Sequence, residues 1–153
     1  MPKKLIHGLT HSELVKIALR WLRNTEKCSV VICEMRSQSE EPDAIGWKAA
    51  FSTLVECKAT RADFRSDLRK GARQHMMFGM GVHRYYMTPK GLIESEEVPQ
   101  GWGLLEVAFT GRVSRTVESA RWTLCPIALR NELGLVLSGL RRYQDEERTR
   151  CGA

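Results

Sequence analysis

The sequence predicts an α/β fold for this chain of 153 residues. Segments whose apolar residues recur at helical spacing alternate along the chain with short, β-rich apolar runs. Charged, glycine or proline-containing turns separate these segments. The length suits one domain with a single core, so we expect residues 1–143 to form that domain and the charged segment 144–153 to fray.

The first predicted element is an amphipathic helix over residues 10–23. Its apolar residues, from Leu14 to Trp21, follow helical spacing, and Thr10 with Glu13 forms a capping-box pattern. Three strands are then predicted at residues 28–35, 43–50 and 51–59. Because they follow one another with only turns between them, we expect a meander.

The second predicted helix begins after Thr60, with Asp63 as its capping-box partner, and runs to about Phe78. Further strands are expected at 83–87 and 104–109. A leucine-rich helix is expected at 127–143, and we expect its apolar stripe to pack against an apolar surface. The stripe comprises Leu129, Leu133, Val136, Leu137 and Leu140.

The net charge, the lengths of the apolar runs and the number of cysteines indicate which partners and which cellular compartment to expect. The formal net charge of +6 favours a polyanion such as DNA, although simple solubility would also account for it. No apolar run reaches the roughly 20 residues of a membrane span, and the N-terminus lacks a signal-peptide pattern, so we expect a cytoplasmic protein. The odd number of cysteines, five, favours reduced thiols, with a zinc site from Cys28, Cys33 and a distant histidine as the alternative.

The strongest chemical signal joins Asp43 with Glu56 and Lys58. Glu56 and Lys58 are two residues apart on a strand and therefore share one face, whereas Cys57 points to the other. Pairing of the two strands in a hairpin brings Asp43 beside Glu56. Two carboxylates with waters suit Mg²⁺, and a lysine beside them can orient water or offset charge on a phosphate.

These residues, with longer flanking blocks, resemble the PD-(D/E)xK nuclease superfamily, in particular the MmcB-like DNA repair proteins and related bacterial and phage proteins. The matching blocks are Pro42-Asp43, then Val55-Glu56-Cys57-Lys58 with Arg61-Ala62-Asp63-Phe64, and later Tyr85 to Ile93 and Pro99 to Leu105. Residues 9 to 109 are covered. The resemblance implies a restriction-endonuclease-like core, with a mixed sheet flanked by helices, and a DNA endonuclease acting in repair, recombination or phage DNA metabolism.

The resemblance also implies site roles. Asp43 and Glu56 are expected to bind Mg²⁺, for which Mn²⁺ can substitute, and Lys58 to act in catalysis. Glu13 and Gln74 are secondary candidates, because superfamily members often place an acid on the first helix and a polar residue on the helix after the lysine strand. Glu13 already has a structural role in the capping box.

A basic ridge on the second predicted helix is the expected DNA contact. Four arginines, spaced four residues apart, line the side away from its acids: Arg61, Arg65, Arg69 and Arg73. Like charges at this spacing repel, which favours a phosphate-facing ridge over an ordinary solvated face.

Two other interpretations remain open. Glu56 and Lys58 could form a surface salt bridge with Asp43 as a turn residue, on a nucleic-acid-binding module that does not cleave. The chain could also be an interaction subunit that docks a partner through its C-terminal helix. A homodimer is equally open.

Overall fold

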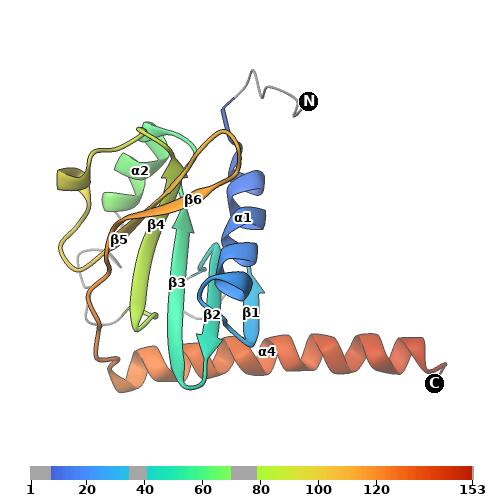
Figure 1. The fold of residues 1–153 in the computed structure, drawn as a ribbon. Coiled ribbons are helices and arrows are strands. Elements are labelled where there is room, and N and C mark those ends of the chain that lie inside the picture. Colours follow the sequence, from blue (N-terminus) through green and yellow to red (C-terminus); the bar gives the residue numbers. More distant parts are fainter. Residues whose placement is uncertain (1–7, 35–40, 70–78, 153) are drawn as a thin grey trace.

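A computed structural model describes residues 8–34, 41–69 and 79–152, and confirms the α/β prediction (Figure 1). Its mixed six-stranded sheet is flanked by helices, with the strands in the order β1-β2-β3-β4-β5-β6. The elements are α1 (His11–Asn24), β1 (Val30–Cys33), β2 (Ala44–Lys48), β3 (Phe51–Cys57), α2 (Arg61–Leu68), β4 (His83–Pro89), η2 (Ser95–Glu97), β5 (Gly103–Val107), β6 (Val113–Val117) and α4 (Pro126–Arg150).

The sheet combines an antiparallel meander with a parallel centre. β1, β2 and β3 pair antiparallel in sequence, which confirms the expected meander. β4 joins β3 in parallel and β5 joins β4 in parallel, while β6 returns antiparallel along β5. Parallel neighbours require crossover connections, and the segments containing α2 and η2 supply them. β6 was not predicted from the sequence.

Alternation along β3 divides the core into two layers. Val55 and Cys57 pack with the apolar face of α1, including Leu14 and Ala18. Leu54, which has the opposite parity, packs on the other face in a cluster that includes residues of α2 and α4. The side chain of Glu56 therefore belongs to the α2 face, as the two-residue period of a strand predicts.

Capping begins both of the first two helices at the predicted residues. Thr10 and Glu13 form the predicted capping box of α1, and the Thr60 hydroxyl accepts the Asp63 N–H at the start of α2. However, α2 ends at Leu68, and the rest of the predicted span, from residue 70 to Phe78, lies outside the described residues. The N–H of Arg69 turns to the Ser66 carbonyl oxygen, 3.2 Å away, a tight closing bond typical of a helix end.

The α4 helix departs from two predictions. It continues to Arg150, so the expectation that residues 144–153 fray was wrong for most of that segment. The predicted leucine stripe is largely exposed, whereas the buried residues of the helix include two polar ones. These are Ala128, Asn131, Glu132 and Leu135.

Glu132 explains why this face is the buried one. Its carboxylate accepts hydrogen bonds from Ser52 Oγ at 2.6 Å, Gly81 N at 2.8 Å and Trp47 Nε1 at 3.0 Å. These donors come from β2, β3 and the segment before β4, so one buried acid ties α4 to the sheet. A buried carboxylate needs such partners, and they override the hydrophobic pattern.

Within the described ranges, no helix is both long and apolar enough to cross a bilayer. All five cysteines are free thiols, as the prediction of reduced cysteines requires.

Candidate active site

The candidate site lies where β3 ends beside the start of β2. Pairing of Ala44 with Val55 places Asp43 next to the end of β3. Its Oδ2 accepts the backbone N–H of Cys57 at 2.7 Å. The hairpin therefore brings Asp43 to the strand that carries Glu56, as predicted.

Lys58 lies in a buried cluster of charged side chains just beyond β3. Its Nζ is 3.1 Å from Asp67 Oδ1 and 3.4 Å from Glu56 Oε2. Lys58 is 8% exposed, Glu56 4% and Asp67 1%. The Glu56–Lys58 pair is thus present but interior, in contrast to the surface salt bridge of the alternative interpretation.

Tyr86 extends this cluster from the neighbouring strand. Its hydroxyl donates to Asp67 Oδ2 at 2.7 Å, while the other oxygen of Asp67 faces Lys58. The Tyr86 ring packs edge-on against Phe64 of α2. A fixed chain of contacts therefore runs from Tyr86 through Asp67 to the ammonium of Lys58.

The surrounding carboxylates keep Lys58 charged. Burial lowers the pKa of Lys58, but the negative charges of Glu56, Asp67 and Asp43 together outweigh it and hold the pKa above its usual value. A protonated ammonium is therefore available at neutral pH at the end of β3.

His11 and Glu34 lie in this region although the sequence did not predict a site role for either. His11 Nε2 is 3.4 Å from Asp43 Oδ1 and 3.8 Å from Glu34 Oε1. Glu34 has a φ of 47°, a left-handed conformation that is unfavourable for a residue with a side chain. The start of α1 and the end of β1 thus add an imidazole and a third acid beside Asp43.

The sequence did not predict Asp67 as a site residue. Its contacts join α2 to β4 and to the end of β3, elements that meet only in the folded chain. The spacing within α2 carries no signal for this contact. The sequence around His11 likewise gives no signal for its contact with Asp43. Its neighbour Thr10 predicts only that a helix starts there.

Of the two secondary candidates, Glu13 and Gln74, the structure describes only Glu13. Glu13 Oε2 accepts from both the backbone N and the hydroxyl of Thr10, at 2.8 Å each. The backbone hydrogen bond from Thr10 lowers the pKa of Glu13, with the hydroxyl contributing next. This carboxylate serves the capping box. Gln74 lies outside the described residues.

Cys57 packs away from the carboxylates, as predicted. It is 1% exposed in the cluster with α1. Burial, followed by the nearby charges of Asp43 and Glu56, raises the pKa of its thiol well above the usual value. A thiol that stays protonated is a poor nucleophile, so Cys57 has a packing role.

The predicted arginine ridge is divided. Arg61 forms an ion pair with Glu97 Oε1 at 2.5 Å and donates to the Leu92 carbonyl oxygen at 2.8 Å, so its guanidinium braces α2 against the segment around η2. Arg65 and Arg69 are exposed. The backbone N–H of Arg69 closes the end of α2. Arg73 lies outside the described residues.

The side-chain oxygen atoms near the end of β3 are of the type that a hard cation such as Mg²⁺ prefers. These include the carboxylate oxygens of Asp43 and Glu56, and Mg²⁺ commonly binds through one or two carboxylates while keeping several waters. Within residues 8–34, 41–69 and 79–152 no three histidine, cysteine or acidic side chains form a ready metal-binding group.

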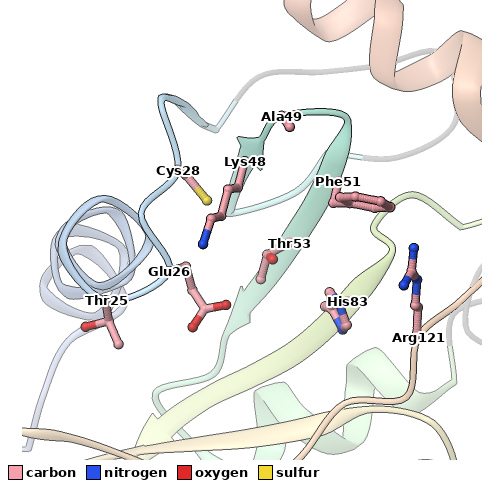
Figure 2. Close-up of a pocket in the computed structure, with 9 residues that line it drawn as sticks. All are labelled: Thr25, Glu26, Cys28, Lys48, Ala49, Phe51, Thr53, His83 and Arg121. Carbon is pink, nitrogen blue, oxygen red and sulfur yellow. The ribbon is translucent and has the colours of Figure 1, made fainter.

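A separate cavity of about 540 Å³ lies toward the other end of β3 (Figure 2). Its lining includes Phe51 and Thr53 of β3, His83 of β4, Lys48 and Arg121. Thr53 pairs with His83 and Glu56 pairs with Tyr86, so three residues of strand, about 10 Å, separate His83 from the level of Glu56. His83 therefore lies away from the carboxylates.

Comparisons with known proteins bear on the fold. No family model and no curated protein matches the chain. A solved structure, the SPO1766 protein of unknown function from Silicibacter pomeroyi, is similar with a TM-score of 0.68. It shares 18% sequence identity, and the match covers 95% of this chain and 96% of that one. At this identity the likeness shows a shared fold.

Proposed function

We propose that the chain is a Mg²⁺-dependent DNA nuclease of the restriction-endonuclease-like type. The observation that carries the proposal is the buried Lys58 between Glu56 and Asp67, at the strand end that Asp43 adjoins. Burying a charge costs several kcal/mol per ion, of order 5. A cluster of three buried charged side chains therefore costs the fold stability, which is expected where the cluster serves a function. Clusters with perturbed pKa values are typical of functional sites.

Each residue of the cluster has a role in this proposal. Asp43 and Glu56 would hold the cation, with the Asp43 position fixed by the backbone N–H of Cys57. The bound Mg²⁺ would make a water more acidic and offset charge on the phosphate. Lys58 orients that water or stabilises the charge that develops on the phosphate. Asp67 and Tyr86 are positioning residues, because they act by holding Lys58.

His11 is assigned a positioning role beside Asp43. Its Nε2 faces the Asp43 oxygen that the Cys57 N–H does not occupy. A hydrogen bond from the imidazole would orient this carboxylate toward the edge of the sheet, as outer partners do for metal ligands.

The order of elements supports the assignment of fold type. A helix, a three-stranded meander and a further helix precede β4 and β5, which extend the sheet in parallel from β3. The two acids and the lysine lie on the second and third strands of the meander or at their ends. DNA as the partner rests on the net charge of +6 and the exposed Arg65 and Arg69. A cytoplasmic location is part of the same proposal.

A second candidate is a nucleic-acid-binding module that does not cleave. Lys58 contacts two carboxylates, and one oxygen of Asp43 is bonded to the backbone. Such a cluster can hold a strand end in place without chemistry. This candidate keeps the basic surface and uses its acids for structure.

The test is a cleavage panel of supercoiled plasmid with single- and double-stranded oligonucleotides, in Mg²⁺, Mn²⁺ and EDTA. Cleavage by the wild type should require the metal, and Asp43→Asn or Glu56→Gln should abolish it. Glu96→Gln, at an exposed acid of η2, is the matched control and should cleave normally. DNA binding without cleavage in any metal would reject the nuclease in favour of the binding module.

A further inference from the structure

The cavity of about 540 Å³ toward the other end of β3 carries more cations than acids in its lining (Figure 2). Lys48 and Arg121 bring two positive charges, and Glu26 is the acidic side chain of the lining. Among the described residues, neither Lys48 nor Arg121 forms an ion pair, whereas Glu26 is paired with Arg115. The lining therefore keeps two cations without an acidic partner in the described chain.

The register of the sheet fixes most of this lining. Lys48 and Phe51 are paired directly across β2 and β3, and the side chains of such a pair project from the same face. Thr53 lies two residues after Phe51 and therefore shares this face, and it pairs with His83 of β4. The cavity is thus built on three adjacent strands.

The guanidinium of Arg121 is held at the cavity by an aromatic ring. Its Cζ lies 4.6 Å from the centroid of the Phe51 ring. This attraction to the ring face does not use the N–H groups of the guanidinium, whose planar fork matches the geometry of phosphate. Figure 2 shows Arg121 and Lys48 on opposite sides of the lining. A ligand lying between them would meet both cations.

His83 adds a polar group that lacks a partner in the described chain. Its Nδ1 is buried and has no hydrogen bond among the described residues. Buried polar atoms are nearly always hydrogen-bonded in native proteins, so this nitrogen indicates a partner from outside the described chain.

The negative groups on this side of the molecule are already engaged. Glu26 contacts Arg115, which also contacts Glu118. At the end of α1 the carbonyl oxygen of Trp21 accepts the N–H groups of Thr25 and Glu26, at 2.8 and 3.1 Å. These bonds reduce the free negative charge that a helix carries at its C-terminus. An anion in the cavity is therefore not opposed by a free carboxylate of the lining.

We propose that this cavity binds a phosphate monoester, with the phosphate group between Lys48 and Arg121. Such a group carries about two negative charges at pH 7, which matches the two cations, whereas a carboxylate carries one. The volume is within the range of small-molecule sites, so the cavity has room for more than the phosphate. A free phosphorylated small molecule and the 5′ end of a DNA strand both supply this group. Binding here is independent of the nuclease function, because it uses none of the residues of the candidate active site.

Isothermal titration of the full chain without divalent metal tests the proposal. The wild type should bind deoxyadenosine 5′-monophosphate and, more weakly, inorganic phosphate, whereas deoxyadenosine and acetate should not bind. Lys48→Ala and Arg121→Ala should each weaken binding of the monophosphate by about tenfold, because each removes a charged hydrogen-bond donor. Lys90→Ala, at an exposed lysine just beyond the other end of β4, is the matched control and should bind normally.

Oligonucleotides then distinguish the two sources of the phosphate. If a strand end is the ligand, a 5′-phosphorylated oligonucleotide should bind more tightly than its 5′-hydroxyl counterpart, and Arg121→Ala should remove the difference. If a free small molecule is the ligand, the monophosphate should bind and the two oligonucleotides should not differ. Circular dichroism confirms that each variant, at an exposed position, is folded. A wild type that recognises neither the monophosphate nor the 5′-phosphate overturns the proposal, as does binding that survives Lys48→Ala/Arg121→Ala.

Discussion

Lys58 shows how single residues combine to define this site. The lysine was predicted from its spacing to Glu56, and strand alternation correctly placed both on the face opposite Cys57. Asp67 and Tyr86, which hold the ammonium from the other side, could not be predicted. They belong to a helix and a parallel strand whose contact is tertiary, and no local pattern encodes it.

The Asp67 contact should be the main restraint on Lys58. Asp67→Asn leaves a buried ammonium with one acid, so the free energy of unfolding should fall by about 3 kcal/mol. Tyr86→Phe removes one hydrogen bond to the same carboxylate and should cost about 1 kcal/mol. Urea denaturation at neutral pH measures both. An Asp67→Asn variant no less stable than Tyr86→Phe would contradict this role.

The thiols should differ in reactivity according to burial. Burial, with a smaller effect of Glu26, raises the pKa of Cys28 to about 11, and Cys57 is shifted in the same direction. At pH 8.5 iodoacetamide should therefore modify exposed Cys151 first, as mass spectrometry of the peptides will show. Because the folded pKa of Cys28 is raised, its contribution to stability is complete below the unfolded pKa of about 8.5 and is lost as pH rises toward 11. Cys28 or Cys57 reacting as fast as Cys151 in the folded protein would refute this ranking.

At the scale of elements, local signals located the helices and strands better than they located buried faces. The capping box at Thr10, the N-cap at Thr60 and the meander were predictable, since their signals lie within a few residues. The buried face of α4 was not. Glu132 is buried because three donors from distant segments converge on it, and the leucines beside it remain exposed.

Glu132 should therefore be the residue that anchors α4. Glu132→Ala leaves the N–H groups of Trp47 and Gly81 and the Ser52 hydroxyl without their acceptor, and should lower the free energy of unfolding by about 3 kcal/mol. Glu146→Ala, at an exposed acid of the same helix, should change it by less than about 0.5 kcal/mol. Chemical denaturation monitored by tryptophan fluorescence distinguishes them. Equal effects would mean that the carboxylate does not hold the helix.

At the scale of the whole molecule, the fold separates its charges by location. The acids Asp43 and Glu56 gather at the end of β3, whereas exposed Arg65 and Arg69 lie on α2, the helix that follows this strand. A polyanion lying along α2 would therefore pass close to the candidate site. The predicted continuous ridge was too simple, because Arg61 is engaged with Glu97 within the chain.

The remaining ridge should appear in the salt dependence of DNA binding. Arg65→Glu/Arg69→Glu should reduce the slope of log affinity against log salt concentration by about 2, because each substitution removes one cation that neutralises a phosphate. Arg61→Ala should leave the slope unchanged and instead reduce stability slightly, by about 0.5 kcal/mol, since its partners are Glu97 and the Leu92 carbonyl. Fluorescence anisotropy across a salt series measures the slopes. An unchanged slope in the double variant would make these arginines ordinary solvated surface.

Asp43 and Glu56 are proposed to hold a divalent cation jointly, beside Lys58. Isothermal titration with Mn²⁺ and Mg²⁺, with and without DNA, tests it most directly. The wild type should bind the ion, Asp43→Asn and Glu56→Gln should each lose that binding while remaining folded, and Lys58→Met should retain it. A folded wild-type protein that binds neither ion in either condition would contradict the account.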